Sequence, residues 1–317
     1  MAEKKIITVF GATGNQGGSV VDIFLNDLKL NKEWSVRAVT RDTTKESAKK
    51  LEAQGAQVVK ADLTDKETLV KAVSGAYAVF AVTNYWEKMD AELEVIQGKS
   101  IVDAANEAGV KLLIWSSLYD VKKLTKGQLS HVYHFDSKAK VEEYARSTGI
   151  AAAYFMPGFY MSNLPGQMLR PSPPNNGWTL TLPMPESAPI PMFDIADTGK
   201  FVKAIVSNQE QVLGKRILGA AKYMTPKEII EKFKALYPVA GKAATFFPIS
   251  NDAYLSVLQG TGLPDFAATE LLENMSLMNE GGYYGGESLD ESHALLDDPL
   301  TSWEEFMKKS PVLRELK

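Results

Sequence analysis

The sequence predicts an α/β protein of the Rossmann type, with a doubly wound parallel sheet and a smaller α+β C-terminal domain. Three observations lead to this prediction. A short apolar run, Ile6–Phe10, ends in a glycine-rich turn and is followed by an amphipathic helical pattern. Strand and helix patterns then alternate six times up to about residue 157. Beyond that point the alternation stops and proline becomes frequent.

Each predicted strand is a short apolar run, and each predicted helix shows apolar residues at a spacing of three or four. Besides 6–10, strands are expected at 35–40, 57–63, 77–82, 110–115 and 151–155. Helices are expected at 19–28, 43–53, 89–108 and 136–147, and another is expected to begin at Thr64. Thr64 with Glu67 three residues later forms a capping-box pattern.

The second half predicts a different kind of structure. Seven of the 15 prolines lie between Pro171 and Pro191, so no helix or interior strand is expected there, only an extended lobe or lid. A helix at 196–207 is expected to pack back on the first domain. Thr225–Glu228 and Thr301–Glu304 are helix starts, 245–249 is a short strand, and 281–286 is a loop whose tyrosines are a weaker candidate for ligand contact.

These patterns predict two domains. Residues 1–157, with about 190–208 packing back, form the Rossmann domain. Residues 158–189 and 209–317 form the smaller C-terminal or lid domain.

Composition excludes several classes of protein. The formal net charge is −4 and no basic run is present, so direct nucleic-acid binding is not expected. No apolar stretch is long enough to span a membrane, and the short N-terminal run has no signal-peptide cleavage site. The chain has no cysteine and only three histidines, so neither thiolate chemistry nor a metal site is expected. The cytoplasm is the expected location, with the nucleus as an additional one.

The glycine turn after the first strand predicts a dinucleotide site. It reads Gly11-Ala12-Thr13-Gly14-Asn15-Gln16-Gly17, a Gly-x-x-Gly-x-x-Gly spacing. Glycines permit a tight turn, close approach of a pyrophosphate and close packing of helix on strand. The free N–H groups and the dipole of the following helix favour an anion. The alternative is that these glycines serve only the turn.

The end of the second strand indicates which dinucleotide binds. An NAD site would place an acidic residue there, whereas this chain has Arg41, with Lys45 four residues on. A guanidinium suits a ribose 2′-phosphate. NADP(H) is therefore the expected cofactor, with NAD(H) binding more weakly. The alternative is an exposed Arg41 paired with Asp42 or Glu46.

Several segments together resemble the NmrA-like family, an atypical branch of the short-chain dehydrogenases/reductases. They are Gly11–Gly17, Arg41, Ala61–Leu63, Val82–Glu87, His134–Lys138 and the helix at Trp303–Phe306. The resemblance covers nearly the whole chain and is strongest to NmrA-like NADP(H)-sensing redox sensors. It implies a dinucleotide in the cleft between two domains. It also implies a role in transcriptional regulation through a partner protein, with a homodimer as a further possibility.

The resemblance also assigns site residues. Thr13, Gly14, Asn15 and Gln16 would line the pyrophosphate, and Asp62 would lie near the adenine. Thr83 and Asn84 would flank the cofactor, Lys99 and Lys138 would reach the ribose or phosphates, and Tyr160 and Asn163 would border the nicotinamide. Lys99 has an alternative as an ordinary exposed lysine, and Asn163 as a cap of the turn before Pro165.

The expected proton donor of a reductase is missing. Reductases of this superfamily use Tyr-x-x-x-Lys, with both side chains on one helical face. Lys138 is present, but the residue four before it is His134, and Tyr133 is out of register by one residue, about 100° around a helix. Ser116 or Ser117 could supply the usual serine.

His134 and Lys138 are therefore the only catalytic candidates. The sequence favours a regulator or redox sensor without classical dehydrogenase activity, acting through cofactor-dependent protein association. The alternative is an NAD(P)H-dependent reductase of the isoflavone- or quinone-reductase type.

Overall fold

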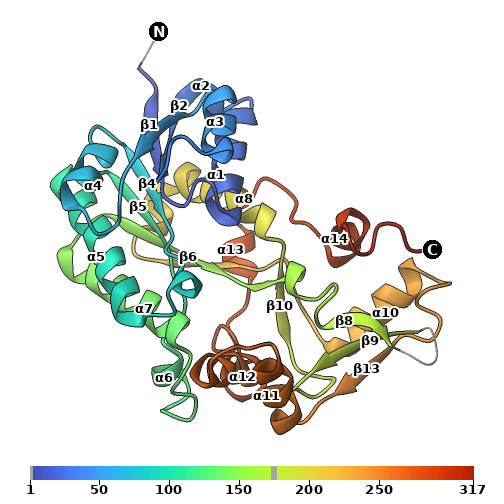
Figure 1. Cartoon of the computed structure of the whole chain (residues 1–317). Coiled ribbons are helices and arrows are strands. Elements are labelled where there is room, and N and C mark those ends of the chain that lie inside the picture. Colours follow the sequence, from blue (N-terminus) through green and yellow to red (C-terminus); the bar gives the residue numbers. More distant parts are fainter. Residues whose placement is uncertain (1–2, 173–176) are drawn as a thin grey trace.

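A parallel sheet of seven strands forms the centre of the protein in a computed structural model, which describes residues 3–172 and 177–317 (Figure 1). The strand order is β11-β6-β5-β4-β1-β2-β3, and every neighbouring pair is parallel. The strands are β1 (Lys5–Val9), β2 (Trp34–Thr40), β3 (Gln57–Lys60), β4 (Ala78–Ala81), β5 (Leu112–Ser116), β6 (Ala152–Pro157) and β11 (Arg216–Gly219). The predicted Rossmann-type fold is confirmed.

Helices cover both faces of this sheet, as Figure 1 shows. On one face α1 and α8 pack together with Phe24 and Phe201 in a common apolar cluster, and on the other α4, α5 and α7 do so with Leu69, Ile101 and Val141. The helices of this domain are α1 (Asn15–Asn26), α2 (Leu30–Glu33), α3 (Glu46–Ala53), α4 (Lys66–Val73), α5 (Ala91–Glu107), α6 (Val121–Leu124), α7 (Tyr133–Thr148), α8 (Thr198–Ser207) and α9 (Gln209–Val212). The helix predicted at 196–207 does pack back on α1.

The strand order reverses direction between β1 and β4. From β1 the chain moves outward to β2 and β3, and then returns to the other side of β1 to form β4, β5 and β6. Because all these strands are parallel, their carboxyl ends lie at one edge of the sheet. A crevice opens at the reversal in such folds, and ligands bind there.

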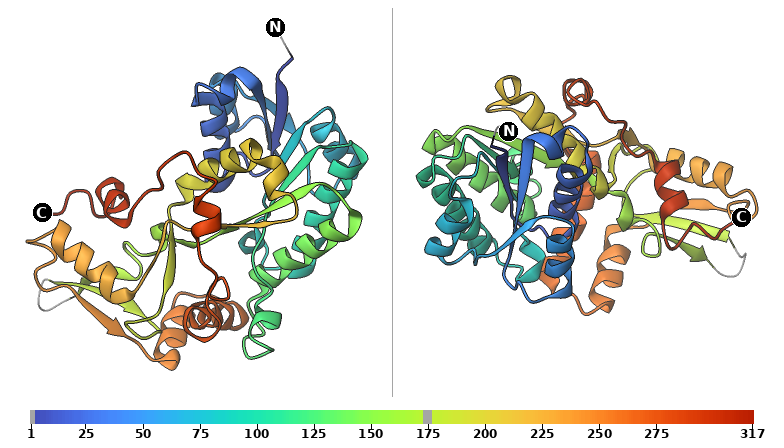
Figure 2. Two further views of the ribbon diagram at one scale, coloured as in Figure 1. Left: turned by 180° about the vertical axis from the view of Figure 1, so that it is seen from behind. Right: turned by 90° about the horizontal axis from the view of Figure 1, so that it is seen from above.

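The smaller lobe lies to one side of the Rossmann domain and contains two three-stranded sheets (Figure 2). One sheet has the order β12-β10-β7 and the other β13-β9-β8. The strands are β7 (Phe159–Tyr160), β8 (Leu169–Ser172), β9 (Gly177–Leu182), β10 (Ile190–Phe193), β12 (Lys222–Met224) and β13 (Thr245–Pro248). The helices are α10 (Pro226–Leu236), α11 (Asn251–Gly260), α12 (Asp265–Glu280), α13 (Asp290–His293) and α14 (Trp303–Lys309). Within residues 3–172 and 177–317 there are also three single-turn 3-10 helices: η1 (Tyr85–Glu87), η2 (Met161–Asn163) and η3 (Ile195–Asp197).

The proline-rich segment corrects one prediction. Interior strands do form there, because β9 and β10 are each the middle strand of a small sheet. Pro171 lies on the edge strand β8, and Pro191 precedes the residues of β10 that pair with β7, so neither ring removes a needed hydrogen bond. The two prolines at 173 and 174 lie outside the described residues.

A second correction concerns residues 209–219, which were expected in the smaller domain. They form α9 and β11, and β11 extends the main sheet by pairing with β6. The chain therefore completes the main sheet at 216–219 before it enters the smaller lobe, so these residues belong with the Rossmann sheet rather than with the smaller domain.

Some of the predicted helix N-termini agree with the structure and others do not. Thr225 and Ser302 begin α10 and α14 with complete capping boxes. In α4 the cap is Asp65, whose carboxylate accepts from the N–H groups of Glu67 and Thr68, rather than the predicted Thr64. The helix predicted from 136 begins at Tyr133. No helix in the described part of the chain combines the length and apolar character that crossing a bilayer requires.

Candidate functional site

Two adjoining cavities lie at the carboxyl ends of β1 and β4. The inner cavity has a volume of about 660 Å³ and the outer one about 400 Å³. Both are lined by Gly11, Val82, Asn84 and Tyr85, so together they form one groove at the point where the strand order reverses. The groove includes the glycine turn, which the sequence predicts to be a dinucleotide site.

The glycine turn forms the floor where the two cavities meet. Gly11 has φ +66°, a conformation that favours glycine, and its carbonyl accepts the N–H of Gly14 at 2.9 Å. A Cβ at Gly17 would lie 2.3 Å from the Gly11 carbonyl oxygen, so no side chain fits there. Helix α1 starts after Gly14 without a side-chain cap and without an acidic residue in its first turn. Its N-terminal N–H groups are thus available for an anion.

The outer cavity contains the residues predicted to select the cofactor. Thr13, Arg41, Lys45 and Asp62 all line it. The Arg41 guanidinium lies 2.6 Å from the carboxylate of Glu87, so its partner is neither Asp42 nor Glu46. Glu87 was not predicted as a site residue, although it lies in one of the segments that carry the family resemblance.

Asp42 and Asp62 are each held by a neighbouring threonine. The Asp42 carboxylate accepts the N–H and hydroxyl of Thr44, and the Asp62 carboxylate accepts those of Thr64. These hydrogen bonds lower the pKa of both aspartates. Asp62 is therefore an ionised acceptor on the wall of the outer cavity.

Gln16 connects the glycine turn to the inner cavity. Its carboxamide oxygen accepts the Ser116 hydroxyl at 2.8 Å, and its nitrogen donates to the Tyr160 hydroxyl at 2.8 Å. Burial raises the pKa of Tyr160 to about 12. The predicted residues Gln16 and Tyr160 therefore meet, and Ser116 holds the amide of Gln16 in place.

Lys138 is buried beside a carboxylate that the sequence analysis missed. Its ammonium lies 2.6 Å from Glu94, which is 2 % exposed. The same carboxylate accepts the hydroxyl of Thr83 at 2.7 Å and that of Ser137. Lys138 lines the inner cavity and Glu94 the outer one, so their ion pair lies at the junction of the two.

His134 is held by a second buried carboxylate, Glu270 of α12. The Glu270 oxygens lie 2.7 Å from the backbone N–H of His134, 2.6 Å from its Nδ1 and 2.7 Å from the hydroxyl of Tyr85. Glu270 is fully buried. Burial lowers the pKa of His134, and the nearby carboxylate opposes this only in part. His134 is thus a neutral imidazole that donates from Nδ1.

The rest of the inner cavity is largely apolar. Tyr160 and Asn163, which the family resemblance assigns to the nicotinamide, line it from the segment after β6. Leu258 of α11 and Met275 of α12 also line it. Tyr283, from the predicted glycine-rich loop, also lines the cavity, and its hydroxyl donates to the carbonyl of Pro157 at 3.2 Å.

A family model described as "NmrA-like family" matches residues 3–307. The chain belongs to the NmrA-like family. This confirms the resemblance identified from the sequence. Two curated relatives are NmrA-like family domain-containing oxidoreductases. One, ptmS from Penicillium ochrochloron, is 30% identical over 305 residues, covering 91% of this chain and 88% of its own. The other, FrzB from Cladobotryum sp, is 31% identical over 304 residues, covering 89% and 87%.

Solved structures share the fold of this NmrA-like protein. The negative transcriptional regulator NmrA in complex with NADP superposes with a TM-score of 0.79 at 21% identity, covering 96% of this chain and 94% of its own. An NADPH-dependent quinone oxidoreductase from Escherichia coli gives a TM-score of 0.73 at 22% identity, covering 94% and 97%. A regulator and an enzyme thus have the same fold, so the fold alone does not decide between these functions.

Three residues considered for the site of this NmrA-like protein lie elsewhere. Lys99 lines neither cavity, and its ammonium lies 4.8 Å from the centre of the Tyr144 ring, so the prediction that it reaches the cofactor is not supported. The Ser117 hydroxyl donates to Glu142 at 2.6 Å, away from the groove. The ring of Tyr133 packs edge-on against His131 and does not line the inner cavity.

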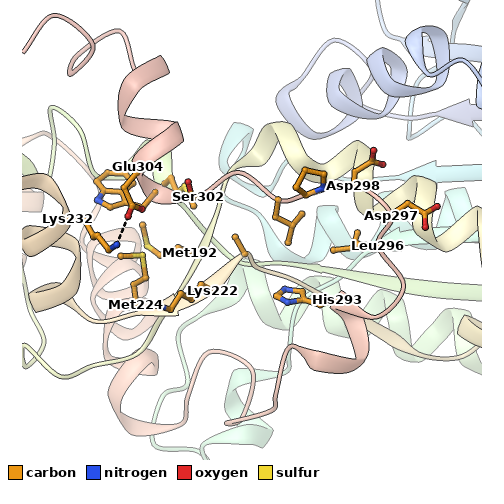
Figure 3. A pocket seen from close by; sticks show the side chains of 15 residues that line it. Met192, Lys222, Met224, Lys232, His293, Leu296, Asp297, Asp298, Ser302 and Glu304 are labelled. Carbon is orange, nitrogen blue, oxygen red and sulfur yellow. Dashed lines mark ion pairs between the residues drawn. The ribbon is translucent and has the colours of Figure 1, made fainter. Parts of the chain in front are cut away.

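A further cavity of about 700 Å³ lies between the two lobes and is drawn in Figure 3. Met192 and Met224 line it, and an ion pair of 2.6 Å joins Lys232 to Glu304 at one end. Neither the glycine turn nor Arg41, His134 or Lys138 lines this cavity. Among the residues that the structure describes, no group of three or more His, Asp or Glu side chains is arranged to hold a metal ion.

Proposed function

We propose that this NmrA-like protein binds NADP(H) along the groove, with the adenosine end in the outer cavity and the nicotinamide end in the inner cavity. The shape of the glycine turn supports this. Gly17 lets the start of α1 pack directly on the turn, since a Cβ there would lie 2.3 Å from the Gly11 carbonyl oxygen, and the first turn of α1 has no side-chain cap, so its N–H groups are available at the groove. Arg41 and Lys45 provide positive charge where the second strand ends.

The residues around the groove suit the parts of such a cofactor. Gly11, Thr13, Gly14, Asn15, Gln16 and Gly17 would hold the pyrophosphate. Asp62 would accept from the adenosine, and Thr83, Asn84, Lys138, Tyr160 and Asn163 would surround the nicotinamide ribose and ring. Solved structures of the same fold contain NADP or NAD, which agrees with this assignment.

We further propose that the protein is a regulator that responds to the bound dinucleotide without consuming it. The observation that carries this proposal is the state of the two candidate catalytic residues. His134 donates to Glu270, and Lys138 is paired with Glu94, each at 2.6 Å. A nicotinamide supplies a hydride when bound, but a reductase also needs a positioned proton donor. No tyrosine stands one helical turn before Lys138.

Such a regulator would act through association with a partner protein or with a second copy of itself, in the cytoplasm or the nucleus. A cofactor shifts this association only if the associated and free forms bind it with different affinity. The test is to titrate the protein with NADPH, NADP, NADH and NAD in turn. Each titration measures the affinity for the dinucleotide and the molecular mass of the protein. Equal binding of all four cofactors with no change in mass would contradict the sensor.

A reductase is the second candidate function. The inner cavity favours it, because its 660 Å³ and its apolar wall would accept a small apolar molecule beside the nicotinamide. The relatives' name, oxidoreductase, agrees with it. The test is NADPH oxidation with a panel of carbonyl and quinone compounds. Steady turnover that His134→Ala or Lys138→Ala abolishes would establish the reductase, and no turnover despite tight NADPH binding would exclude it for that panel.

A further inference from the structure

Arg41 and Glu87 form an ion pair on the wall of the outer cavity, where the ribose 2′ position is expected. The pair is 2.6 Å long, and the side chains are 65% and 35% exposed. From this geometry we propose that Glu87 sets the preference between NADP(H) and NAD(H), because its carboxylate competes with the 2′-phosphate for Arg41. The inference rests on the proposed binding of NADP(H) in this groove.

The backbone that carries Glu87 is fixed. Glu87 ends the single-turn helix η1, and Tyr85 at its start is 3% exposed and donates to the buried Glu270. After the turn, Met89 has φ +53° and its N–H donates to the Tyr85 carbonyl at 2.7 Å. The carboxylate of Glu87 therefore cannot leave Arg41 through a movement of the loop without breaking these contacts.

The other carboxylates of the outer cavity already have partners. Asp42 and Asp62 accept from neighbouring threonines, and Asp90 caps α5 by accepting the N–H of Leu93 at 2.9 Å. Glu94 accepts from Lys138. Glu87 is the carboxylate paired with the residue predicted to read the 2′-phosphate.

The pair affects the two cofactors differently. A phosphate monoester carries a charge of about −1.5 to −2 near neutral pH. If it binds Arg41, it must displace or share the Glu87 carboxylate, and the two anions then repel each other in the same cavity. A 2′-hydroxyl is neutral and causes no such repulsion. Glu87 therefore reduces the preference for NADP(H) over NAD(H) that Arg41 alone would provide.

The test is Glu87→Gln, which keeps the size of the side chain and removes its charge. We expect NADPH to bind about three- to tenfold more tightly at low salt, and NADH to change by less than about twofold. The gain should shrink as salt is raised, because the pair is solvent-exposed. Glu92→Gln is the matched control, since Glu92 is an exposed residue of the nearby helix α5 that does not line the cavity.

A second background separates competition for Arg41 from simple repulsion. In a chain that already carries Arg41→Ala, Glu87→Gln should increase the affinity for NADPH by a clearly smaller factor than it does in the natural chain. An equal gain in both backgrounds would overturn the inference, as would an unchanged ratio of NADPH to NADH affinity in Glu87→Gln. If the natural chain binds NADH and NADPH and only this ratio fails to move, the proposed function stands. If it binds neither dinucleotide, both proposals are wrong.

Discussion

Gly17 is the residue at which the backbone leaves no room for a side chain. A Cβ there would lie 2.3 Å from the oxygen and 2.5 Å from the carbon of the Gly11 carbonyl. Both atoms belong to the backbone of the turn, so Gly17→Ala must shift the turn itself. We expect the free energy of unfolding to fall by about 2 kcal/mol and dinucleotide affinity to fall about tenfold or more. Urea denaturation and cofactor titration measure the two effects.

The neighbouring glycine provides the control. A Cβ at Gly18 would lie 3.5 Å from the Ala12 carbonyl oxygen, an ordinary contact, and the position is inside α1. Gly18→Ala should raise the stability by about 0.5–1 kcal/mol, because alanine has the higher helix propensity. If both substitutions were equally harmful, the close approach at Gly17 would not be the cause.

Arg41 lines the outer cavity where the second strand ends. Arg41→Ala should weaken NADP(H) binding by about 1–2 kcal/mol, the value of a charge-assisted contact reduced by exposure. NAD(H) should bind almost as before, because it has no 2′-phosphate. Fluorescence titration of NADPH and NADH measures this difference. An equal loss for both cofactors would mean that Arg41 does not read the phosphate.

Local patterns predicted the residues of the turn but not their partners. Gly11, Gln16 and Arg41 all line the groove, because a glycine turn after a strand and a basic residue at a strand end are local features of the sequence. Glu94 and Glu270 were missed because they lie 44 and 136 residues from Lys138 and His134. No local signal links residues so far apart. The position of Lys99 depends on a contact with another helix, since its ammonium lies over the ring of Tyr144 on α7 and the residue lines neither cavity.

Helix α4 begins at a different cap from the one that its sequence pattern indicates. The sequence pattern indicated Thr64 as its cap, but Asp65 makes the contacts, because the Thr64 hydroxyl donates to Asp62 instead. Asp65→Ala should lower the free energy of unfolding by about 1 kcal/mol, since two N–H groups lose their acceptor. Glu67→Gln is the control and should change little, as no capping box forms there. Equal losses in the two variants would contradict Asp65 as the cap.

Elements with strong local patterns were predictable, and those that depend on distant pairing were not. Strands β1 to β6 are apolar runs between turns, and all were expected. Strand β11 has only four residues and gains its identity by pairing with β6, about 60 residues earlier in the chain. Likewise β9 forms because it pairs with β8 and β13. The number of prolines in the segment does not indicate this pairing.

At the scale of the whole molecule, α12 joins the second lobe to the Rossmann domain. Glu270 and Glu273 of this helix each accept from the backbone N–H and Nδ1 of a histidine, His134 and His131. Glu270 is fully buried, whereas His131 is 47% exposed in its side chain. Glu270→Gln should therefore lower the free energy of unfolding by about 2 kcal/mol. Glu273→Gln should lower it by less than about 0.5 kcal/mol. Similar losses in urea denaturation would show that burial does not set the strength of these contacts.

Asp27 lies where distant parts of the chain meet, and its ion pair is expected to contribute to stability in acid. Lys203 of α8 lies 2.7 Å from Asp27, which follows α1, and 2.8 Å from Asp298 near the C-terminus. The hydrogen bond from Lys203, helped by the N–H groups of Leu30 and Lys29, lowers the pKa of Asp27 to about 2 from 3.8. A carboxyl with a lowered pKa stabilises the folded state above its unfolded pKa, and this contribution is lost as the pH falls through the folded value.

We therefore expect the free energy of unfolding to fall by about 1–2 kcal/mol through this site as the pH drops from about 5 to 2. Asp27→Asn should remove that part of the pH dependence and lower the stability at pH 7 by a similar amount. Glu52→Gln, at an exposed position of α3, serves as the control. Urea denaturation at several pH values measures both variants. If Asp27→Asn and the natural chain lost stability in parallel below pH 5, the contact among α1, α8 and the C-terminal segment would not contribute to the loss of stability in acid.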